Sequence, residues 1–100
     1  MKYRLRSTKQ YNRWFGDLKD AGVKVKILAR LDRVENGNFG DFKQISSNLF
    51  ELRFFFRGGL RIYYTIRDDR IVLLLAGGDK STQAKNIAKA NHLMNEQLED

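Results

Sequence analysis

Hydrophobic positions along this chain repeat at two different periods, one typical of helices and the other of strands. Over residues 11–18, aromatic and aliphatic side chains recur every three or four positions, as on one face of a helix. Ser7 and Gln10 have the spacing of a capping box. The pattern predicts a helix over residues 8–20. Its inward face would carry Tyr11, Trp14, Phe15 and Leu18.

A second helical repeat follows and ends near Glu35, before a turn-forming Asn-Gly-Asn run. We expect Gly22 to end the first helix in a left-handed conformation. The apolar positions of the second helix are Val25, Ile27, Leu28, Leu31 and Val34. The two helices are predicted to form an antiparallel hairpin, with Lys and Arg on the outer side, and residues 38–43 a loop. Residues 2–6 could add a short edge strand.

Three later segments alternate apolar and other residues with a period of two, which indicates strands with one buried face. They are Leu49–Phe56, Leu60–Arg67 and Arg70–Ala76. Their short spacers favour an antiparallel meander. A final helical repeat over residues 82–97 predicts a C-terminal helix with a weakly apolar stripe. That stripe would be Ala84, Ile87, Ala88, Asn91, Met94 and Leu98.

The fold class predicted from these elements is α+β, a helical hairpin packed on a small antiparallel sheet, in one domain over residues 1–100. The lengths of the turns predict which residues of neighbouring strands face each other. A three-residue loop with Gly59 left-handed places Arg53 across from Tyr63 and Arg61 across from Phe55.

The next turn fixes the position of the last strand. A two-residue turn at Asp68-Asp69 sets Tyr64 opposite Leu73, Tyr63 opposite Leu74 and Arg61 opposite Ala76. This register brings Lys80 close to Arg61.

Composition narrows the function classes. The chain has 100 residues with no cysteine, and its net charge is +7. Disulfides, thiolate metal sites and cysteine nucleophiles are therefore excluded. The charged N-terminus resembles no signal peptide and no segment has membrane-spanning length, so we expect a cytoplasmic protein. The positive charge suits a nucleic acid or an acidic protein, and equally a solvated basic surface.

The run from Gly77 to Gln83 joins an apolar strand to a helix start, where unpaired N–H groups favour an anion. Lys80 adds a charge there, and the register brings in Arg53 and Arg61. Such cations can stabilise the phosphorane that forms when a ribose 2′-hydroxyl attacks its own phosphodiester. In the alternative interpretation, both arginines are solvent-facing strand residues paired with carboxylates.

Two aromatic residues accompany these cations. Tyr63 could stack on a base or exchange a proton, and Phe55 could widen a stacking surface. Packing under a helix is the alternative role for each. His92 is the only histidine, and we expect it to be a solvated helix residue. One histidine and no cysteine make transition-metal ligation improbable.

Several motifs together resemble the RelE/ParE toxin superfamily, and most closely its HigB-like "addiction module killer protein" subgroup. The resemblance spans nearly the whole chain. The motifs are Gly-Asn-Phe-Gly-Asp-Phe-Lys at 37–43, Phe-Glu-Leu-Arg at 50–53, Gly-Leu-Arg-Ile-Tyr-Tyr at 59–64 and Leu-Ala-Gly-Gly-Asp-Lys-Ser-Thr-Gln at 75–83.

This resemblance implies the toxin of a type II toxin–antitoxin pair, most often a ribosome-dependent, metal-independent endoribonuclease that cuts mRNA and needs no cofactor. Its implied partners are the ribosome, mRNA and an antitoxin, a helix-turn-helix protein encoded by the adjacent gene. The catalytic candidates are Arg53, Arg61, Lys80 and Tyr63. Candidate RNA-binding residues are Lys43, Phe55, Arg57, Gly78, Ser81 and Gln83.

Two points stay open. The tyrosine or histidine that follows the last basic residue in other members is replaced here by Asn86 and Ile87, so the proton-transfer group could be Tyr63, Glu51, Asp79, Gln83 or the ribosome. The alternative functions are a ParE-type inhibitor of DNA gyrase and a noncatalytic RNA-binding or regulatory module.

A further expectation concerns the antitoxin. The sheet face with Arg53 and Tyr63 is predicted to carry Val72 and Leu74 as well. Such a face is too apolar to stay bare and too charged for a core. It would fit an acidic antitoxin helix or strand.

Overall fold

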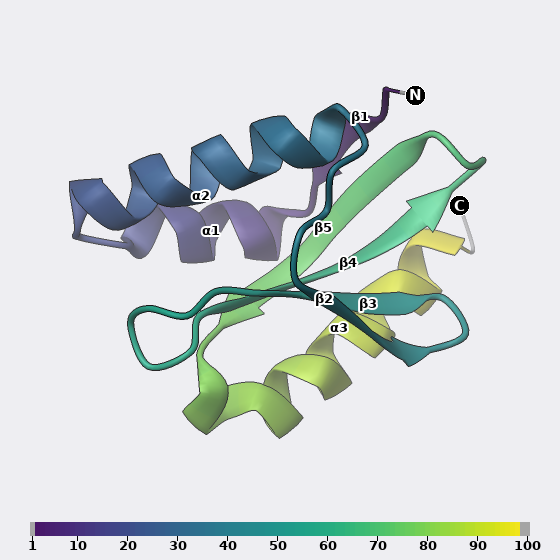
Figure 1. Ribbon diagram of the computed structural model, residues 1–100. Coiled ribbons are helices and arrows are strands. Elements are labelled where there is room, and N and C mark those ends of the chain that lie inside the picture. Colours follow the sequence, from purple (N-terminus) through teal and green to yellow (C-terminus); the bar gives the residue numbers. More distant parts are fainter. Residues whose placement is uncertain (1, 99–100) are drawn as a thin grey trace.

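The structure is a computed structural model that describes residues 2–98 (Figure 1). A helical hairpin covers one face of a five-stranded sheet and a C-terminal helix covers the other. The elements are β1 Arg4–Ser7, α1 Lys9–Asp17, α2 Ala21–Glu35, β2 Phe42–Ser46, β3 Leu49–Arg53, β4 Arg61–Arg67, β5 Ile71–Gly78, the 3-10 turn η1 Lys80–Thr82 and α3 Gln83–Leu98. The predicted α+β fold is confirmed.

The sheet has the strand order β1-β5-β4-β3-β2. β1 pairs with β5 in parallel and the other neighbours are antiparallel, so the predicted meander and edge strand are both present. β2 is a strand that the sequence did not predict, because it begins inside the expected loop. Most of its side chains are exposed, which leaves little alternation to detect.

The ends of the first two helices differ from the prediction. Thr8, not Ser7, caps α1, because its hydroxyl accepts a hydrogen bond from the Tyr11 N–H at 3.0 Å. Gly22 does not end α1; it lies in the first turn of α2. The carboxylate of Asp20 caps α2 by accepting from the N–H groups of Gly22 and Val23 at 2.9 and 3.2 Å.

The inward faces of two helices are rotated relative to the predicted stripes. On α2, Val25 and Leu28 are exposed, because the face that meets the sheet starts two residues earlier. It consists of Val23, Ile27, Arg30, Leu31 and Val34. On α3, Ala84 and Ala88 are exposed, whereas the packed residues are Ile87, Ala90, Leu93 and Met94. The predicted position of the Leu98 side chain falls outside the described side chains.

The core has two layers, one on each face of the sheet. The helical hairpin packs on residues that include Leu52, Ile62, Tyr64, Val72 and Leu74. α3 packs on Leu49, Tyr63, Leu73 and Leu75. Val72 and Leu74 therefore lie on the hairpin face, and the prediction that they share a bare face with Arg53 and Tyr63 is wrong.

The pairing of β3 with β4 is shifted by two residues from the predicted register. Arg53 faces Arg61 and Glu51 faces Tyr63. The connecting loop is longer than predicted, closing with a hydrogen bond from the Phe54 N–H to the Leu60 oxygen at 2.9 Å. A shift of two residues keeps every side chain on its predicted face.

β5 departs from its predicted register in two steps. The turn between β4 and β5 has three residues, 68–70, rather than the predicted two, so Arg67 faces Ile71 and Val72 and Leu74 move to the other face of the sheet. A β-bulge then adds a second shift of one residue. Tyr64 faces Leu74 and Tyr63 faces Ala76, so Leu75 is the extra residue. Arg61 consequently faces Gly78 rather than Ala76. The bulge also turns Gly77 toward the helical hairpin, where Trp14 lies directly against its backbone.

Replacing Gly77 with alanine is expected to destabilise the fold by about 1–3 kcal/mol, because the added methyl group would overlap the Trp14 indole. Urea denaturation followed by Trp14 fluorescence measures this loss. The matched control is Gly16→Ala in α1, where nothing lies within 4 Å of the new methyl group. In that control the free energy of unfolding should rise by about 0.5–1 kcal/mol, because alanine has a higher helix propensity than glycine. Equal stability of the two variants would contradict this packing.

Candidate functional site

The predicted catalytic cations gather at one end of the sheet, where the β3–β4 loop meets η1. Arg53 and Arg61 face each other on neighbouring strands. The Lys80 N–H donates to the Gly58 oxygen at 3.3 Å, which fixes η1 against the loop. A methyl group built on Gly59 would lie 3.3 Å from the Lys80 Cβ and 3.8 Å from the Arg61 Nη2. Lys80 and Arg61 are therefore close neighbours across Gly59.

The β3–β4 loop turns through three consecutive left-handed residues. Arg57, Gly58 and Gly59 have φ of 55°, 68° and 78°. Glycine adopts this conformation freely, whereas Arg57 does so at a cost. The loop presents Phe55 to solvent with 87% of its surface exposed, and Arg57 forms an exposed ion pair with Asp20 at 3.4 Å.

Two of the three cations are already paired with carboxylates. Arg53 forms hydrogen bonds of 3.2 Å with both carboxylate oxygens of Asp41, which raise the pKa of Arg53, and both side chains are about one-third exposed. The Nε of Arg61 lies 3.7 Å from Oε1 of Glu51. Within residues 2–98, Lys80 forms no ion pair, and its side chain is exposed.

Glu51 is a fully buried carboxylate beneath the start of α3. Gln83 donates from Nε2 to its Oε1 at 2.8 Å. A buried carboxylate needs such partners, because desolvation opposes its charge. Glu51 lies beside the Arg61 guanidinium as a counter-charge, although the Arg61 Nε and the Glu51 Oε2 are buried without a hydrogen-bond partner within residues 2–98. The Arg61 Nη2 reaches the loop beside Lys80.

Tyr63 does not reach the solvent. Its side chain is completely buried under α3, and its hydroxyl has no hydrogen-bond partner in the part of the chain that the structure describes. Burial, together with the neighbouring charge of Glu51, raises the pKa of Tyr63. The Tyr63 ring therefore packs the site from below, which is the role given above as the alternative to stacking on a base.

Arg30 is a residue of this region that sequence reasoning missed. It is buried, and its guanidinium donates to the backbone oxygens of Phe39, Asp41 and Arg53 over distances of 2.7–3.1 Å. It also lies 4.8 Å from the centre of the Phe54 ring. Burial lowers the pKa of Arg30. By fixing residues 39–41 against β3, Arg30 places Asp41 next to Arg53.

The predicted anion site at the helix start is occupied by the chain itself. The Asp79 carboxylate accepts hydrogen bonds from the N–H groups of Ser81 and Thr82 at 2.9 and 3.2 Å, and from the Ser81 hydroxyl at 2.6 Å. The expectation that these N–H groups are free for an anion is therefore wrong. Two predicted RNA-binding side chains are also engaged internally, Ser81 with Asp79 and Gln83 with Glu51.

The hydrogen bonds from Ser81 and Thr82 lower the pKa of Asp79 in the folded protein. The ionised carboxylate therefore stabilises the fold at pH values above the pKa of Asp79 in the unfolded chain. This stabilisation is lost as the pH falls through the pKa of Asp79 in the folded protein. Asp79→Asn keeps a capping oxygen but not the charge. We expect wild type to exceed this variant in melting temperature by a constant margin above about pH 5, which narrows below about pH 4. Thermal unfolding across this range measures the margin. A melting-temperature difference that does not change with pH would refute this role of the Asp79 charge.

The remaining predicted residues lie on β5, β2 and α3. A side chain at Gly78 would collide with Asn86, so this glycine allows α3 to approach β5. Lys43 is exposed on β2, opposite Glu51 in the ladder. His92 is exposed, as predicted, and lies 3.4 Å from Glu96.

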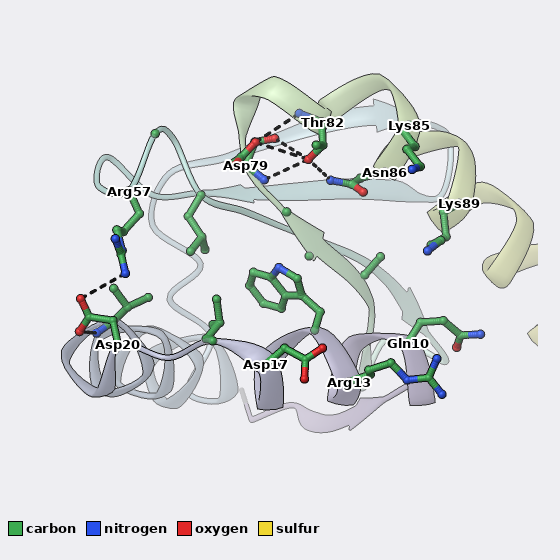
Figure 2. Close-up of a pocket in the computed structure, with 18 residues that line it drawn as sticks. Gln10, Arg13, Asp17, Asp20, Arg57, Asp79, Thr82, Lys85, Asn86 and Lys89 are labelled. Carbon is green, nitrogen blue, oxygen red and sulfur yellow. Dashed lines mark hydrogen bonds and ion pairs between the residues drawn. The ribbon is translucent and has the colours of Figure 1, made fainter.

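A hollow of about 800 Å³ lies beside these residues, between α1 and α3 (Figure 2). β1 pairs with β5 only as far as Leu74, so the end of β5 forms the floor together with Trp14. Figure 2 shows Lys85 and Lys89 of α3 across from Gln10 and Arg13 of α1. The lining carries four basic residues, Arg13, Arg57, Lys85 and Lys89, against the three carboxylates of Asp17, Asp20 and Asp79.

Within residues 2–98 no group of three His, Asp or Glu side chains is placed to hold a metal ion. None of the described helices has the length and apolar character required to cross a bilayer.

Comparison with known proteins places this geometry in a known fold. A mutant of the E. coli toxin RelE in the free state has a TM-score of 0.67 at 14% identity, over 89% of this chain and 98% of that one. The crystal structure of the intact E. coli RelBE toxin–antitoxin complex gives 0.59 at 15% identity, over 77% of this chain and 95% of that one. The fold is therefore RelE-like.

Sequence comparison identifies the family. The family model described as phage derived protein Gp49-like (DUF891) matches residues 13–95. A Haemophilus influenzae protein, described as uncharacterized, is 41% identical over 96 residues, which are 96% of this chain and 97% of that protein. The chain belongs to the Gp49-like family, and the predicted membership of the RelE/ParE superfamily is confirmed.

Proposed function

We propose that the chain is a HigB-like toxin of a type II toxin–antitoxin pair that cleaves mRNA on the ribosome. The observation that carries this proposal is the placement of Arg61 and Lys80 side by side across Gly59, with Arg53 on the neighbouring strand. The likeness to RelE, alone and in complex with its antitoxin, supports it. The implied site of action is the bacterial cytoplasm.

In this mechanism the RNA supplies its own nucleophile, the 2′-hydroxyl group next to the scissile phosphate. The oxygen–phosphorus bond forms as the 5′-oxygen leaves, giving a 2′,3′-cyclic phosphate and a 5′-hydroxyl end. The phosphorane between these states carries added negative charge. Lys80 provides an exposed ammonium group, and Arg61 provides the outer N–H groups of its guanidinium.

Glu51 acts on Arg61 as a positioning residue. Because its carboxylate is buried and lies against the Arg61 Nε, it orients the guanidinium without itself facing the substrate. Arg53 is held differently, by hydrogen bonds that it donates to both carboxylate oxygens of the partly exposed Asp41. Preorganised donors need no rearrangement when charge develops, which is how such groups accelerate a reaction.

An antitoxin is the second proposed partner. Lys80 forms no ion pair within residues 2–98, and the chain has a net charge of +7, so an acidic segment would complement this surface. The neighbouring reading frame checks this point, since the proposal expects a small helix-turn-helix protein there.

A noncatalytic RNA-binding module is the second candidate, and one observation favours it. Arg61 and Arg53 are both partly neutralised by carboxylates, which suits a binding surface as well as a catalytic one. Inhibition of DNA gyrase has no comparable support among the described contacts.

The test is in vitro translation of a defined message, with primer extension to map new RNA ends. The proposal expects ends that appear only in the presence of both the protein and ribosomes. Intact message with translation blocked would favour the binding module. Intact message and unimpaired translation, with gyrase inhibited in a supercoiling assay, would replace the proposal with the ParE-type function.

A further inference from the structure

A second hollow, of about 450 Å³, lies between α2 and the β3–β4 loop. Its α2 wall consists of Lys26, Ala29, Arg30 and Arg33, which share one helix face at spacings of three and four residues. The facing wall is the aromatic run Phe54–Phe56.

We propose that this hollow binds one unpaired nucleotide of single-stranded RNA, with its base on Phe55 and its phosphate between Lys26 and Arg33. The inference rests on the proposed function in taking RNA as the ligand, and it assigns binding roles to Lys26 and Arg33, outside the cleavage cluster.

Phe55 is presented on a fixed backbone. Its neighbour Phe54 is buried and donates its N–H to Leu60 at 2.9 Å, and Phe56 packs edge-to-face against Phe54. The flanking residues therefore hold the loop while the Phe55 ring stays exposed. An exposed ring on an ordered loop can stack on any unpaired base, because every base has a π face.

The charges around the ring favour an anion. Lys26, Arg30, Arg33 and Arg53 line the hollow with Asp41 as the one carboxylate in its lining. Lys26 Nζ lies 4.9 Å from the Phe56 ring centre, so its ammonium group is held over the hollow's aromatic wall. Since Arg30 is engaged with backbone oxygens, Lys26 and Arg33 are the cations available to a phosphate.

Arg53 links the hollow to the cleavage cluster, because it lines the hollow and faces Arg61 in the ladder. A strand held here would therefore continue toward Arg61 and Lys80. Acidic side chains would satisfy only the cations, whereas one unpaired nucleotide places its phosphate on the cations and stacks its base on the Phe55 ring.

The test measures fluorescence anisotropy of a short, labelled single-stranded 2′-O-methyl RNA, which cannot be cut by its own 2′-hydroxyl groups. Phe55→Leu should weaken binding about tenfold without changing the salt dependence, and Phe55→Trp should preserve binding. Lys26→Gln and Arg33→Gln should each lower the slope of log affinity against log salt by about 1. The control is Phe42→Leu, an exposed aromatic on β2 outside the hollow, with no expected change.

Unchanged RNA affinity in Phe55→Leu would overturn the inference. Variants that lose affinity for a polyglutamate probe, but not for RNA, would also overturn it. The two proposals fail separately. If message cleavage occurs but Phe55→Leu binds RNA normally, the nucleotide site is wrong and the nuclease stands. If Phe55 and the two basic residues govern RNA affinity but no message is cut, the site stands and the nuclease is wrong.

Discussion

Replacing Arg30 with methionine is expected to lower the free energy of unfolding by about 3–5 kcal/mol. Methionine keeps an apolar stem of comparable reach but leaves the backbone oxygens of Phe39, Asp41 and Arg53 without their buried donor. Because a domain of this size has a total stability of about 5–15 kcal/mol, much of the population could unfold at growth temperature. Urea denaturation followed by the single tryptophan measures the loss.

Arg33→Met is the matched control for this prediction. Arg33 lies one turn further along α2 and is exposed, so its replacement should change stability by less than about 0.5 kcal/mol. Similar stabilities of the two variants would show that the four hydrogen bonds of Arg30 to backbone oxygens contribute little.

The double variant Arg61→Ala with Lys80→Ala is expected to cut ribosome-bound mRNA at least 10²–10³-fold more slowly than the wild type, since loss of one preorganised donor has an effect of about this size. Ribosome binding should weaken only in part, because most of the basic surface remains. Single-turnover cleavage measures the rate, and cosedimentation with ribosomes measures binding.

A control with the same charge loss separates catalysis from general attraction. Arg4→Ala with Arg70→Ala removes two exposed cations at the opposite end of the sheet, where the Arg4 N–H pairs with the Arg70 oxygen. This variant should cleave at close to the wild-type rate. An equal loss in both double variants would mean that net charge, rather than a defined pair, controls activity.

The sequence could predict which face each residue of β3 and β4 occupies, because their alternation survives a register shift of two. It failed for Val72 and Leu74 of β5, where the turn is one residue longer than predicted. It could not predict the shift between β3 and β4, which depends on the three left-handed residues Arg57, Gly58 and Gly59. The bulge at Leu75 has no local sequence signal either, yet it is what sets Gly78 opposite Arg61.

Local sequence patterns could not predict the residues that hold the site from inside the protein. Arg30 occupies a helical position indistinguishable from its exposed basic neighbours, and its acceptors come from two distant segments. Glu51 is buried in a strand where alternation alone suggested a surface position, because α3 covers that face and supplies Gln83. Packing between segments distant in the sequence buries Arg30 and Glu51, and it also buries Tyr63.

Cleavage by the RNA's own 2′-hydroxyl group, assisted by Arg61 and Lys80, is tested most directly by a message that carries a single 2′-deoxynucleotide at the mapped cut position. Single-turnover reactions on ribosomes would compare it with the unmodified message. The predicted result is no cut at the modified position, with the unmodified message ending in a 2′,3′-cyclic phosphate. Cleavage of both messages at the same rate would contradict it.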